Sequence, residues 1–418
     1  MAQLSDDAFA FGSELMPVEE ARRAMAARIS AVPGTESVAL VEADSRVLAD
    51  QLIAPIDLPN FDNSAVDGYA VCFASLAASG ETIMSIAGRV AAGQASEAAL
   101  PDAAVRIFTG APMPENFDTV FMQEDCREHD DGRVVLPAGL QEGANRRPRG
   151  EDIARGETAL AAGRRLGPRE IALAAALGIE RLPVRRRLRI AVFSTGDELV
   201  SPGEKLPPAG LYDSNRFALQ VLLRRLKCDV TDLGILRDRR DAVANALTNA
   251  AREHDAIITS GGVSTGEEDH VRAAMSEAGS LAFWRLAIKP GRPVAMGVVG
   301  GKPFVGLPGN PVAVFVTFAY VVRPLLAALS GEALEPARAL GVTADFDYRK
   351  KKGRREYVRV SLIEDQLAGI ILARKYPVDG AGVLTSLTAT DGLVELPEHV
   401  TQVRRGDRVQ FIDYRLLQ

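Results

Sequence analysis

Between residues 188 and 331, short apolar runs alternate with longer segments in which apolar residues recur every three or four positions. The runs RLRIAVFST, DVTDLGIL and DAIITS are typical of buried strands, and SNRFALQVLLRRLKC, RDAVANALTNAARE and EDHVRAAMSEAG are typical of amphipathic helices. PVAMGVV and KPFVGLP add two strands, and NPVAVFVTFAYVVRPLLAAL adds a helix. Strands that alternate with helices predict an α/β domain with a largely parallel sheet.

Two further regions have a β-rich pattern. Between Pro55 and about Glu151, runs such as YAVCF, TIMSIAGRV and TVFMQED alternate with glycine and proline, which is typical of a mostly β domain. Residues 337–418 again carry short strands and turns, including EYVRVSL and DRVQFIDY. The chain is therefore predicted to be a multidomain α/β plus β protein, with a central α/β domain, a β-rich domain inserted before it and a small C-terminal β-barrel-like domain.

Helical spacing marks two segments outside these regions. Residues 16–29 have a proline near the start and acidic residues in the first turn, so they predict a helix. Residues 168–177 predict a second helix, and residues 36–54 are expected to form a helix and a turn.

Composition narrows the class of protein. A chain of 418 residues predicts two to four domains, and a net charge of −6 argues against a dedicated nucleic-acid binder. Three cysteines lie far apart with no C-x-x-C, which disfavours a zinc site or a disulfide framework and fits a reducing cytoplasm. The N-terminus lacks the features of a signal peptide, and the longest apolar run, Val312 to Val322, is too short to span a bilayer. We expect a cytoplasmic protein with no membrane partner.

Gly262 to Gly266 fits G-x-S-x-G, the nucleophile elbow of α/β hydrolases, and would make Ser264 the nucleophile. A predicted strand precedes it and a predicted helix follows, as that motif requires. However, only His270 and His399 follow Ser264, and no HGGG-type oxyanion motif lies upstream. The missing partners of a triad disfavour a hydrolase.

The strand ends suggest an anion site instead. Ligands of parallel sheets bind beyond the carboxyl ends of the strands, where glycine allows close approach and backbone N–H groups cradle phosphate. Glycine, serine, threonine and proline gather at these ends. The candidate residues are Ser194, Thr195, Gly196, Asp197, Gly261, Gly262, Ser264, Gly266, Pro308, Gly309, Asn310 and Pro311.

Acidic residues share this predicted rim. Asp197, Glu198, Asp238 and Asp269 would repel a phosphate unless a hard cation such as Mg²⁺ lay between them. The alternative is that Asp197 and Asp269 only cap helices. Lys289, at the rigid turn AIKPGRP, either faces an anionic ligand or is an ordinary surface lysine.

Together these motifs resemble those of one family. STGDEL (194–199), SGGVSTGEED (260–269), LAIKPGRP (286–293) and GLPGNP (306–311) are similar to motifs of the molybdopterin molybdenumtransferases of molybdenum-cofactor synthesis. LPNFDNSAVDGYAV (58–71), FTGAPMPENFD (108–118) and RRPRGEDI (146–153) resemble three further hallmarks of the family. The match spans nearly the whole chain in the right order.

The resemblance implies four regions in each chain and an elongated homodimer. Its active cleft joins the α/β domain of one chain to the β-rich domain of its partner. It also implies the reaction: a Mg²⁺-dependent step takes adenylylated molybdopterin and molybdate and yields molybdenum cofactor and AMP. The implied boundaries are 16–34 with 187–336 for the molybdopterin-binding α/β domain, 35–54 with 155–186 for a linking domain, 55–154 for the β-rich domain and 337–418 for the C-terminal domain.

Roles of individual residues follow from the same resemblance. Asp67 and Thr109 would enter the partner's cleft, although Asp67-Gly68 is also a good turn signal. Glu198, Asp238 and Asp269 would position metal and substrate. Lys289 would hold a substrate phosphate or molybdate, Pro308 and Pro311 would shape a turn, Ser264 and its glycines would donate to phosphate, and Arg354 and Ser386 of the C-terminal domain would assist.

Some positions depart from the family pattern. Arg285 and Arg292 stand where lysine is usual, and the planar guanidinium makes different contacts from an ammonium group. Val66 replaces a methionine. The basic turn of residues 349–355 either attracts molybdate or the pterin phosphate, or is a solvated hairpin.

Three alternatives remain. The homologous domain of gephyrin anchors receptors, so the fold can also serve as a scaffold. The adenylyltransferase that precedes this step shares the α/β domain but lacks the flanking β domains, and it is a possible partner that delivers substrate. A tungstate-inserting variant is the third, because the two oxyanions are nearly equal in size and charge.

Overall fold

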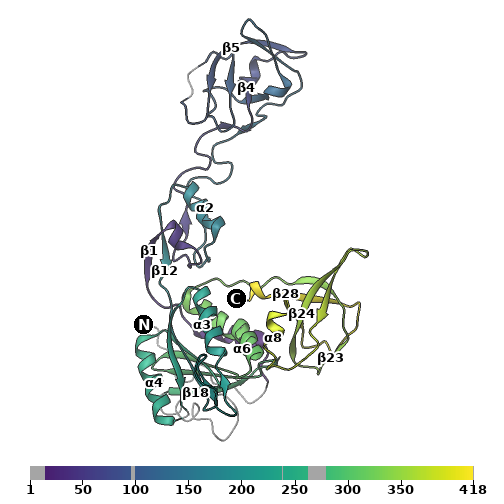
Figure 1. Ribbon diagram of the computed structural model, residues 1–418. Coiled ribbons are helices and arrows are strands. Elements are labelled where there is room, and N and C mark those ends of the chain that lie inside the picture. The colour runs from purple at the N-terminus through teal and green to yellow at the C-terminus, as the bar shows by residue number, and fades with distance from the viewer. Residues whose placement is uncertain (1–14, 96–98, 238, 262–278, 418) are drawn as a thin grey trace.

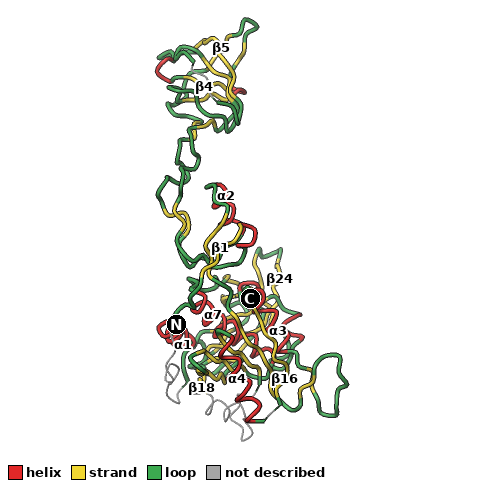
Figure 2. The backbone as a smooth tube through the Cα atoms, turned by 90° about the vertical axis from the view of Figure 1, so that its left-hand side faces the viewer, coloured by secondary structure: helices red, strands yellow, loops and turns green. Residues whose placement is uncertain are grey.

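The computed structural model describes residues 15–95, 99–237, 239–261 and 279–417, without the side chains of residues 281–285. The chain is elongated (Figure 1). A β-rich unit that contains β4 and β5 lies at one end, and the α/β and C-terminal units lie together at the other. A small unit with α2 lies between them. In the perpendicular view, loops connect the β-rich unit to the rest (Figure 2).

The α/β unit is built on a six-stranded sheet of order β16-β13-β17-β21-β20-β18. The first four strands are parallel, which confirms the mostly parallel sheet, and β20 runs antiparallel to both of its neighbours, β21 and β18. A two-residue hairpin loop, Gly300-Gly301, joins β20 to β21, and both glycines have positive φ, as such loops require. The strands are β13 (Arg189–Thr195), β16 (Asp229–Leu236), β17 (Ala256–Ser260), β18 (Gly279–Arg285), β20 (Pro293–Val299) and β21 (Lys302–Leu307).

Helices cover both faces of this sheet. One face packs against α1 (Val18–Arg28), α3 (Asn215–Arg225), α6 (Pro311–Thr317) and α7 (Arg323–Ser330), and the other against α4 (Arg240–Glu253). A π-helical turn, Phe318–Val322, joins α6 to α7. The joined helix Pro311–Ser330 is longer than the apolar run suggested. Among the described residues it alone is long and apolar enough to cross a membrane, but 78% of its apolar window is buried inside the protein, as in a core helix. The helix expected over EDHVRAAMSEAG lies almost wholly outside the described residues.

The small middle unit pairs segments that are far apart in sequence. β1 (Thr35–Ala39) pairs with β12 (Arg181–Arg185), β2 (Leu52–Ile53) pairs with β11 (Thr158–Leu160), and α2 (Pro168–Ala176) covers them. The helix and turn expected over residues 36–54 are therefore only partly correct. A single 3-10 turn, Leu40–Ala43, follows a strand that its distant partner stabilises.

The β-rich unit has a sheet of order β7-β4-β6-β5-β9-β8. A short ladder of β3 and β10 closes its base. The elements are β3 (Asn63–Ser64), β4 (Gly68–Val71), β5 (Thr82–Val90), β6 (Ala104–Ile107), β7 (Thr119–Met122), β8 (Arg127–Glu128), β9 (Arg133–Leu136) and β10 (Arg146–Arg147), with 3-10 turns at Phe73–Ser75 and Gln123–Asp125.

The C-terminal unit is a closed five-stranded barrel. Its strands follow the order β24-β25-β22-β28-β26, and β26 pairs back with β24, which confirms the barrel-like domain. The barrel strands are β22 (Leu340–Ala344), β24 (Arg355–Asp365), β25 (Ile370–Lys375), β26 (Gly392–Leu396) and β28 (Arg408–Asp413). Smaller elements are β14 (Leu199–Val200) with β15 (Leu211–Tyr212), β19 (Ile288–Lys289), β23 (Tyr348–Arg349) with β27 (Gln402–Val403), α8 (Thr385–Thr388) and a 3-10 turn, Tyr414–Leu416.

Candidate functional site

The α/β unit and the barrel meet at the segment that contains Lys289. β19 lies in the α/β unit but pairs with β24 of the barrel, with Ile288 opposite Arg355 and Lys289 opposite Glu356. The Arg355 amide also donates to the Ala287 carbonyl at 2.7 Å. This ladder holds the two units together.

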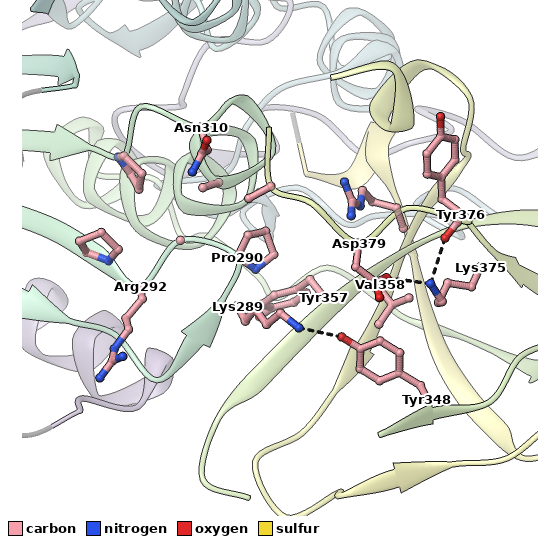
Figure 3. Close-up of a pocket in the computed structure, with 16 residues that line it drawn as sticks. Lys289, Pro290, Arg292, Asn310, Tyr348, Tyr357, Val358, Lys375, Tyr376 and Asp379 are labelled. Atoms are coloured by element: carbon pink, nitrogen blue, oxygen red, sulfur yellow. Dashed lines mark hydrogen bonds and ion pairs between the residues drawn. The ribbon is translucent and has the colours of Figure 1, made fainter. Parts of the chain in front are cut away.

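A cavity of about 280 Å³ lies at this junction (Figure 3). The α/β unit contributes the Lys289–Pro293 turn and the GLPGNP turn, and the barrel contributes β24 and the end of β25. Four of the described lining residues are cations and one is a carboxylate. The cations are Lys289, Arg292, Arg359 and Lys375, and the carboxylate is Asp379.

Lys289 is fixed by partners from the barrel. Its Nζ donates to the Tyr348 hydroxyl at 3.1 Å and to Glu356 Oε2 at 3.3 Å, and Tyr348 donates to the same carboxylate at 2.8 Å. Burial opposes the charge of Lys289, but the hydroxyl and the carboxylate outweigh burial and raise its pKa. Burial likewise opposes the charge of Glu356, but Tyr348, Arg354 and Lys289 together lower the pKa of Glu356. Lys289 is therefore a positioned ammonium group.

Arg359 is a functional candidate that the sequence analysis missed. It lies in the middle of β24, is 6% exposed and lines the cavity. Its guanidinium donates to Ser386 Oγ at 2.7 Å and to the carbonyls of Gly380 at 2.9 Å and Val378 at 3.0 Å. No carboxylate within the described residues forms an ion pair with it. An arginine between apolar residues of a predicted strand, as in EYVRVSL, was the signal that could have revealed it.

The other two barrel residues expected at the site lie beside the cavity and are not among its lining residues. Arg354 donates to Glu356 Oε1 at 2.6 Å, so it shares the neutralisation of that carboxylate with Lys289. Ser386 is fully buried and contacts the cavity only through Arg359. Their direct roles toward a ligand remain predictions. Arg292 lines the cavity, and the side chain of Arg285 lies outside the described atoms.

The carboxyl ends of three parallel strands are tied together above the sheet. Asn215, at the start of α3, donates to Ser260 Oγ at 2.9 Å and to the Gly309 carbonyl at 2.6 Å, and Ser260 Oγ donates to the Pro308 carbonyl at 3.3 Å. Gly261 has φ +88, and a Cβ there would lie 2.4 Å from the Thr195 carbonyl oxygen. The sequence analysis predicted the rim but did not identify Asn215 and Ser260, whose hydrogen bonds connect its strand ends. Asn310 and Pro311 open α6 at the same rim, and Asn310 lines the cavity.

The first strand end of the rim has mixed accessibility. Ser194 and Thr195 are buried, and the Ser194 hydroxyl has no hydrogen-bond partner within the described part of the chain. The Glu198 carboxylate folds over Gly196, where a Cβ would lie 2.6 Å from Oε2. Asp197 is 71% exposed and lies 4.0 Å from Arg237. Of this segment, only the two acids present their side chains to solvent.

Five residues of the expected rim fall outside the described part of the chain. They are Asp238, Asp269, Gly262, Ser264 and Gly266. Of the three predicted metal ligands, the described structure therefore contains Glu198 alone, and no metal-binding group of three acidic, histidine or cysteine side chains occurs within its limits. An exposed carboxylate beside a glycine turn has the hard oxygen donors that suit Mg²⁺.

Asp67 and Thr109 meet each other but not the cavity. Asp67 Oδ1 accepts hydrogen bonds from both the amide and the hydroxyl of Thr109, each at 2.8 Å. These bonds, from the amide first, lower the pKa of Asp67 and keep it ionised. Oδ2 accepts no hydrogen bond from the described residues. The pair lies in the β-rich unit, at the opposite end of the chain from the cavity (Figure 1).

Family comparisons cover nearly the whole chain. Residues 16–178 match the MoeA N-terminal region (domain I and II), residues 191–328 match the probable molybdopterin binding domain, and residues 342–414 match the MoeA C-terminal region (domain IV).

Individual relatives agree. The molybdopterin molybdenumtransferase of Haemophilus influenzae is 37% identical over 398 residues, which are 94% of this chain and 98% of that protein. Molybdopterin molybdenumtransferase 2 of Mycobacterium tuberculosis is 35% identical over 391 residues, covering 90% and 94%. The crystal structure of the molybdopterin biosynthesis moeA protein from Pyrococcus horikoshii OT3 superposes with a TM-score of 0.81 at 29% identity, covering 96% of this chain and 100% of that one. The chain therefore belongs to the molybdopterin molybdenumtransferase family, and it is a transferase of molybdenum cofactor biosynthesis.

Proposed function

We propose that this transferase inserts molybdate into adenylylated molybdopterin in a Mg²⁺-dependent reaction that releases AMP, and that the junction cavity binds molybdate. The observation that carries the proposal is Arg359, a buried cation that lines the cavity and has no carboxylate partner within the described chain. A buried charge is costly unless an opposite charge offsets it. A bound dianion would supply that charge.

The remaining charges of the cavity favour the same ligand. Lys289 shares its charge with Glu356, and Lys375 is paired with Asp379 at 2.7 Å. Arg292 has no carboxylate within ion-pair distance in the described structure, so the cavity keeps a positive excess. A guanidinium donates several hydrogen bonds in a fixed fork and an ammonium group adds rotatable donors, and together they suit a tetrahedral oxyanion. Tungstate has the same shape and charge, so a competition assay must decide between the two metals.

The glycine-rich rim next to the cavity is proposed to hold the phosphates of the pterin substrate. The GLPGNP turn before α6 would present the backbone N–H groups of Gly309 and Asn310, which have no acceptor among the described residues, to phosphate oxygens. Glu198, with Asp238 and Asp269, would hold Mg²⁺. When bound, the ion offsets phosphate charge and polarises the phosphoryl group. Lys289 lies at the turn between the two sites, where it can orient molybdate toward the substrate.

We further propose that the active form is a homodimer in which Asp67 and Thr109 complete the site of the partner chain. The support is their position: two side chains fixed on each other lie at the far end of the chain from Lys289 and Arg359 (Figure 1). The enzyme would receive its substrate from the preceding adenylyltransferase in the cytoplasm, a location that cysteine usage favours.

Release of AMP tests the reaction. The purified full chain is incubated with adenylylated molybdopterin and Mg²⁺, with and without molybdate. We expect AMP release that depends on molybdate and is lost in Lys289→Ala, while Lys227→Ala, which removes a lysine that is 38% exposed beside Asp44 and does not line the cavity, keeps the wild-type rate. No AMP above background from the wild-type enzyme would refute the proposal.

Co-expression tests the shared site. Asp67→Asn and Lys289→Ala chains should each be inactive alone. If the site joins two chains, random pairing makes half of the dimers mixed, and each mixed dimer contains one intact site. Co-expression should then restore about a quarter of the wild-type activity. No recovery, with dimers present by light scattering, would exclude the cross-chain site.

A further inference from the structure

A row of alternating cations and aromatic rings lies beside Asp67. The Arg89 guanidinium carbon lies 4.5 Å from the centroid of the Phe108 ring, and the Arg106 guanidinium carbon lies 5.0 Å from the same ring and 4.9 Å from the Tyr69 ring. We call Arg89, Phe108, Arg106 and Tyr69 the arginine–aromatic row.

The strand register creates this row. Arg106 of β6 is directly opposite Tyr69 of β4 on one side and directly opposite Arg89 of β5 on the other. Side chains of directly paired residues point to the same face of a sheet, and so do those two positions apart. Phe108 is two positions after Arg106, and Asp67 is two positions before Tyr69. The row therefore lies on the same face as Asp67, and Thr109 adjoins that face through its two hydrogen bonds to Asp67.

The two arginines keep their charges available. Arg106 donates to the Gly68 carbonyl at 3.2 Å and to the Gln123 side chain, and both acceptors are neutral. Within the described residues, neither Arg89 nor Arg106 has a carboxylate at ion-pair distance. Other arginines of this unit differ: Arg133 pairs with Asp131 at 2.6 Å, and Arg127 pairs with Glu81 at 2.6 Å. Aromatic faces stabilise a guanidinium without neutralising it.

This arrangement addresses a problem in the proposed site. Asp67 is an anion, and the proposed function brings it to a substrate that carries several phosphate charges. Repulsion between the two would weaken binding unless cations accompany the carboxylate. Arg106 is held beside Asp67 by two bonds: it donates to the carbonyl of Gly68, the next residue, and to the side chain of Gln123, whose backbone amide donates to the Asp67 carbonyl at 3.0 Å. A cation is thus fixed next to the only acid of this face that the proposal uses.

We propose that Arg106, assisted by Arg89, is a substrate-contacting residue that binds the phosphate groups of the pterin substrate in the cleft that Asp67 and Thr109 enter. This inference rests on the proposed function. A planar guanidinium stacked on rings keeps outward N–H groups in a fixed plane, as phosphate recognition requires.

Steady-state AMP release at varied substrate concentration tests the role. Charge-assisted hydrogen bonds to a phosphate predict that Arg106→Ala raises KM for adenylylated molybdopterin by about ten- to a hundredfold, with a smaller effect on kcat. Arg106→Lys should recover part of that loss because it restores the charge but not the planar stack. Arg89→Ala should raise KM by a smaller factor. Arg133→Ala, whose arginine is paired with an acid on the same unit, is the matched control and should keep the wild-type KM.

The outcomes separate the inference from the proposed function. Wild-type KM in a folded Arg106→Ala enzyme would overturn the inference while leaving the proposed function intact. A fall in kcat with unchanged KM in both Arg106 variants would also overturn it, because that pattern indicates that Arg106 only stabilises the sheet and does not bind substrate. Absence of AMP release from the wild-type chain would instead refute the proposed function. If Arg106→Ala does not fold, the exposed Arg89→Ala and the charge-preserving Arg106→Lys decide the question by the same KM measurement.

Discussion

Replacement of Arg359 by methionine should separate stability from function. The change removes a buried cation that lines the junction cavity and keeps a side chain of similar length and flexibility. It also removes three hydrogen bonds, to Ser386 Oγ and to the carbonyls of Gly380 and Val378. The two consequences act on stability in opposite directions.

Their sizes can be compared. Each lost hydrogen bond costs about 1 kcal/mol net, so the three together cost about 3 kcal/mol. Removal of a buried charge that has no carboxylate partner recovers several kcal/mol of desolvation. We therefore expect the free energy of unfolding to change by less than about 2 kcal/mol. Loss of a charge-assisted contact to molybdate is worth about 1.5–3 kcal/mol, which is about a ten- to a hundredfold rise in KM for molybdate.

Two measurements check this prediction. Urea unfolding of the full chain reports stability, and AMP release at varied molybdate concentration reports KM. Arg374→Met is the matched control, because Arg374 is 62% exposed on the same barrel and pairs with Asp345 at 3.1 Å. An unchanged KM for molybdate in Arg359→Met would refute the assignment of the cavity to molybdate. A destabilisation well beyond 3 kcal/mol would refute the reasoning that the free protein bears an uncompensated charge.

Three further predictions concern the rim, the junction and the distant pair. Gly261→Ala should lower the free energy of unfolding by about 1–3 kcal/mol or more, because φ is +88 and the new Cβ would lie 2.4 Å from the Thr195 carbonyl oxygen; calorimetry checks this. The Lys289–Glu356 pair should stabilise the junction most between the two titrations. Because the pKa of Lys289 is raised, the contribution of Lys289 to stability is complete below pH 10.5 and is lost as the pH rises through its folded pKa. Because the pKa of Glu356 is lowered, the contribution of Glu356 to stability is present above pH 4.5 and is lost as the pH falls through its folded pKa. Unfolding curves measured across alkaline pH should therefore decline less steeply for Lys289→Met than for the wild type. Asp67→Asn should lower the rate of AMP release with little change in melting temperature, because Asp67 is partly exposed and its loss leaves no buried charge; unchanged activity would remove it from the site.

Where a segment has a clear hydrophobic periodicity, that local pattern was enough to predict its strand or helix. The alternation of strands and helices between residues 188 and 331 was sufficient for the α/β unit, and the C-terminal runs were sufficient for a small barrel. The prediction for residues 36–54 was less successful, because β1 is stabilised by pairing with β12, about 140 residues later. The sequence of a short segment does not identify a partner strand that is so distant. The sequence analysis also proposed no strand over β18, which is held at the edge of the main sheet by its antiparallel pairing with β20.

The residues of the candidate site were likewise predicted where the signal is local in the sequence and missed where it depends on distant segments. Glycine-rich turns at strand ends are local signals, so the sequence indicated the rim, the Lys289 turn and the Asp67 and Thr109 motifs. Arg359, Asn215 and the arginine–aromatic row act through pairings between distant segments: Arg359 through the α8 loop, Asn215 through two strand ends, and Arg106 through two neighbouring strands. In each case the side chain is polar and satisfied mainly by backbone carbonyls, hydroxyls or rings rather than by an opposite charge. Charge that a protein keeps unpaired at such a position is available to a ligand. For this reason the uncompensated cations, which only the three-dimensional structure reveals, are stronger candidates for substrate contacts than the exposed acids that the motifs made conspicuous.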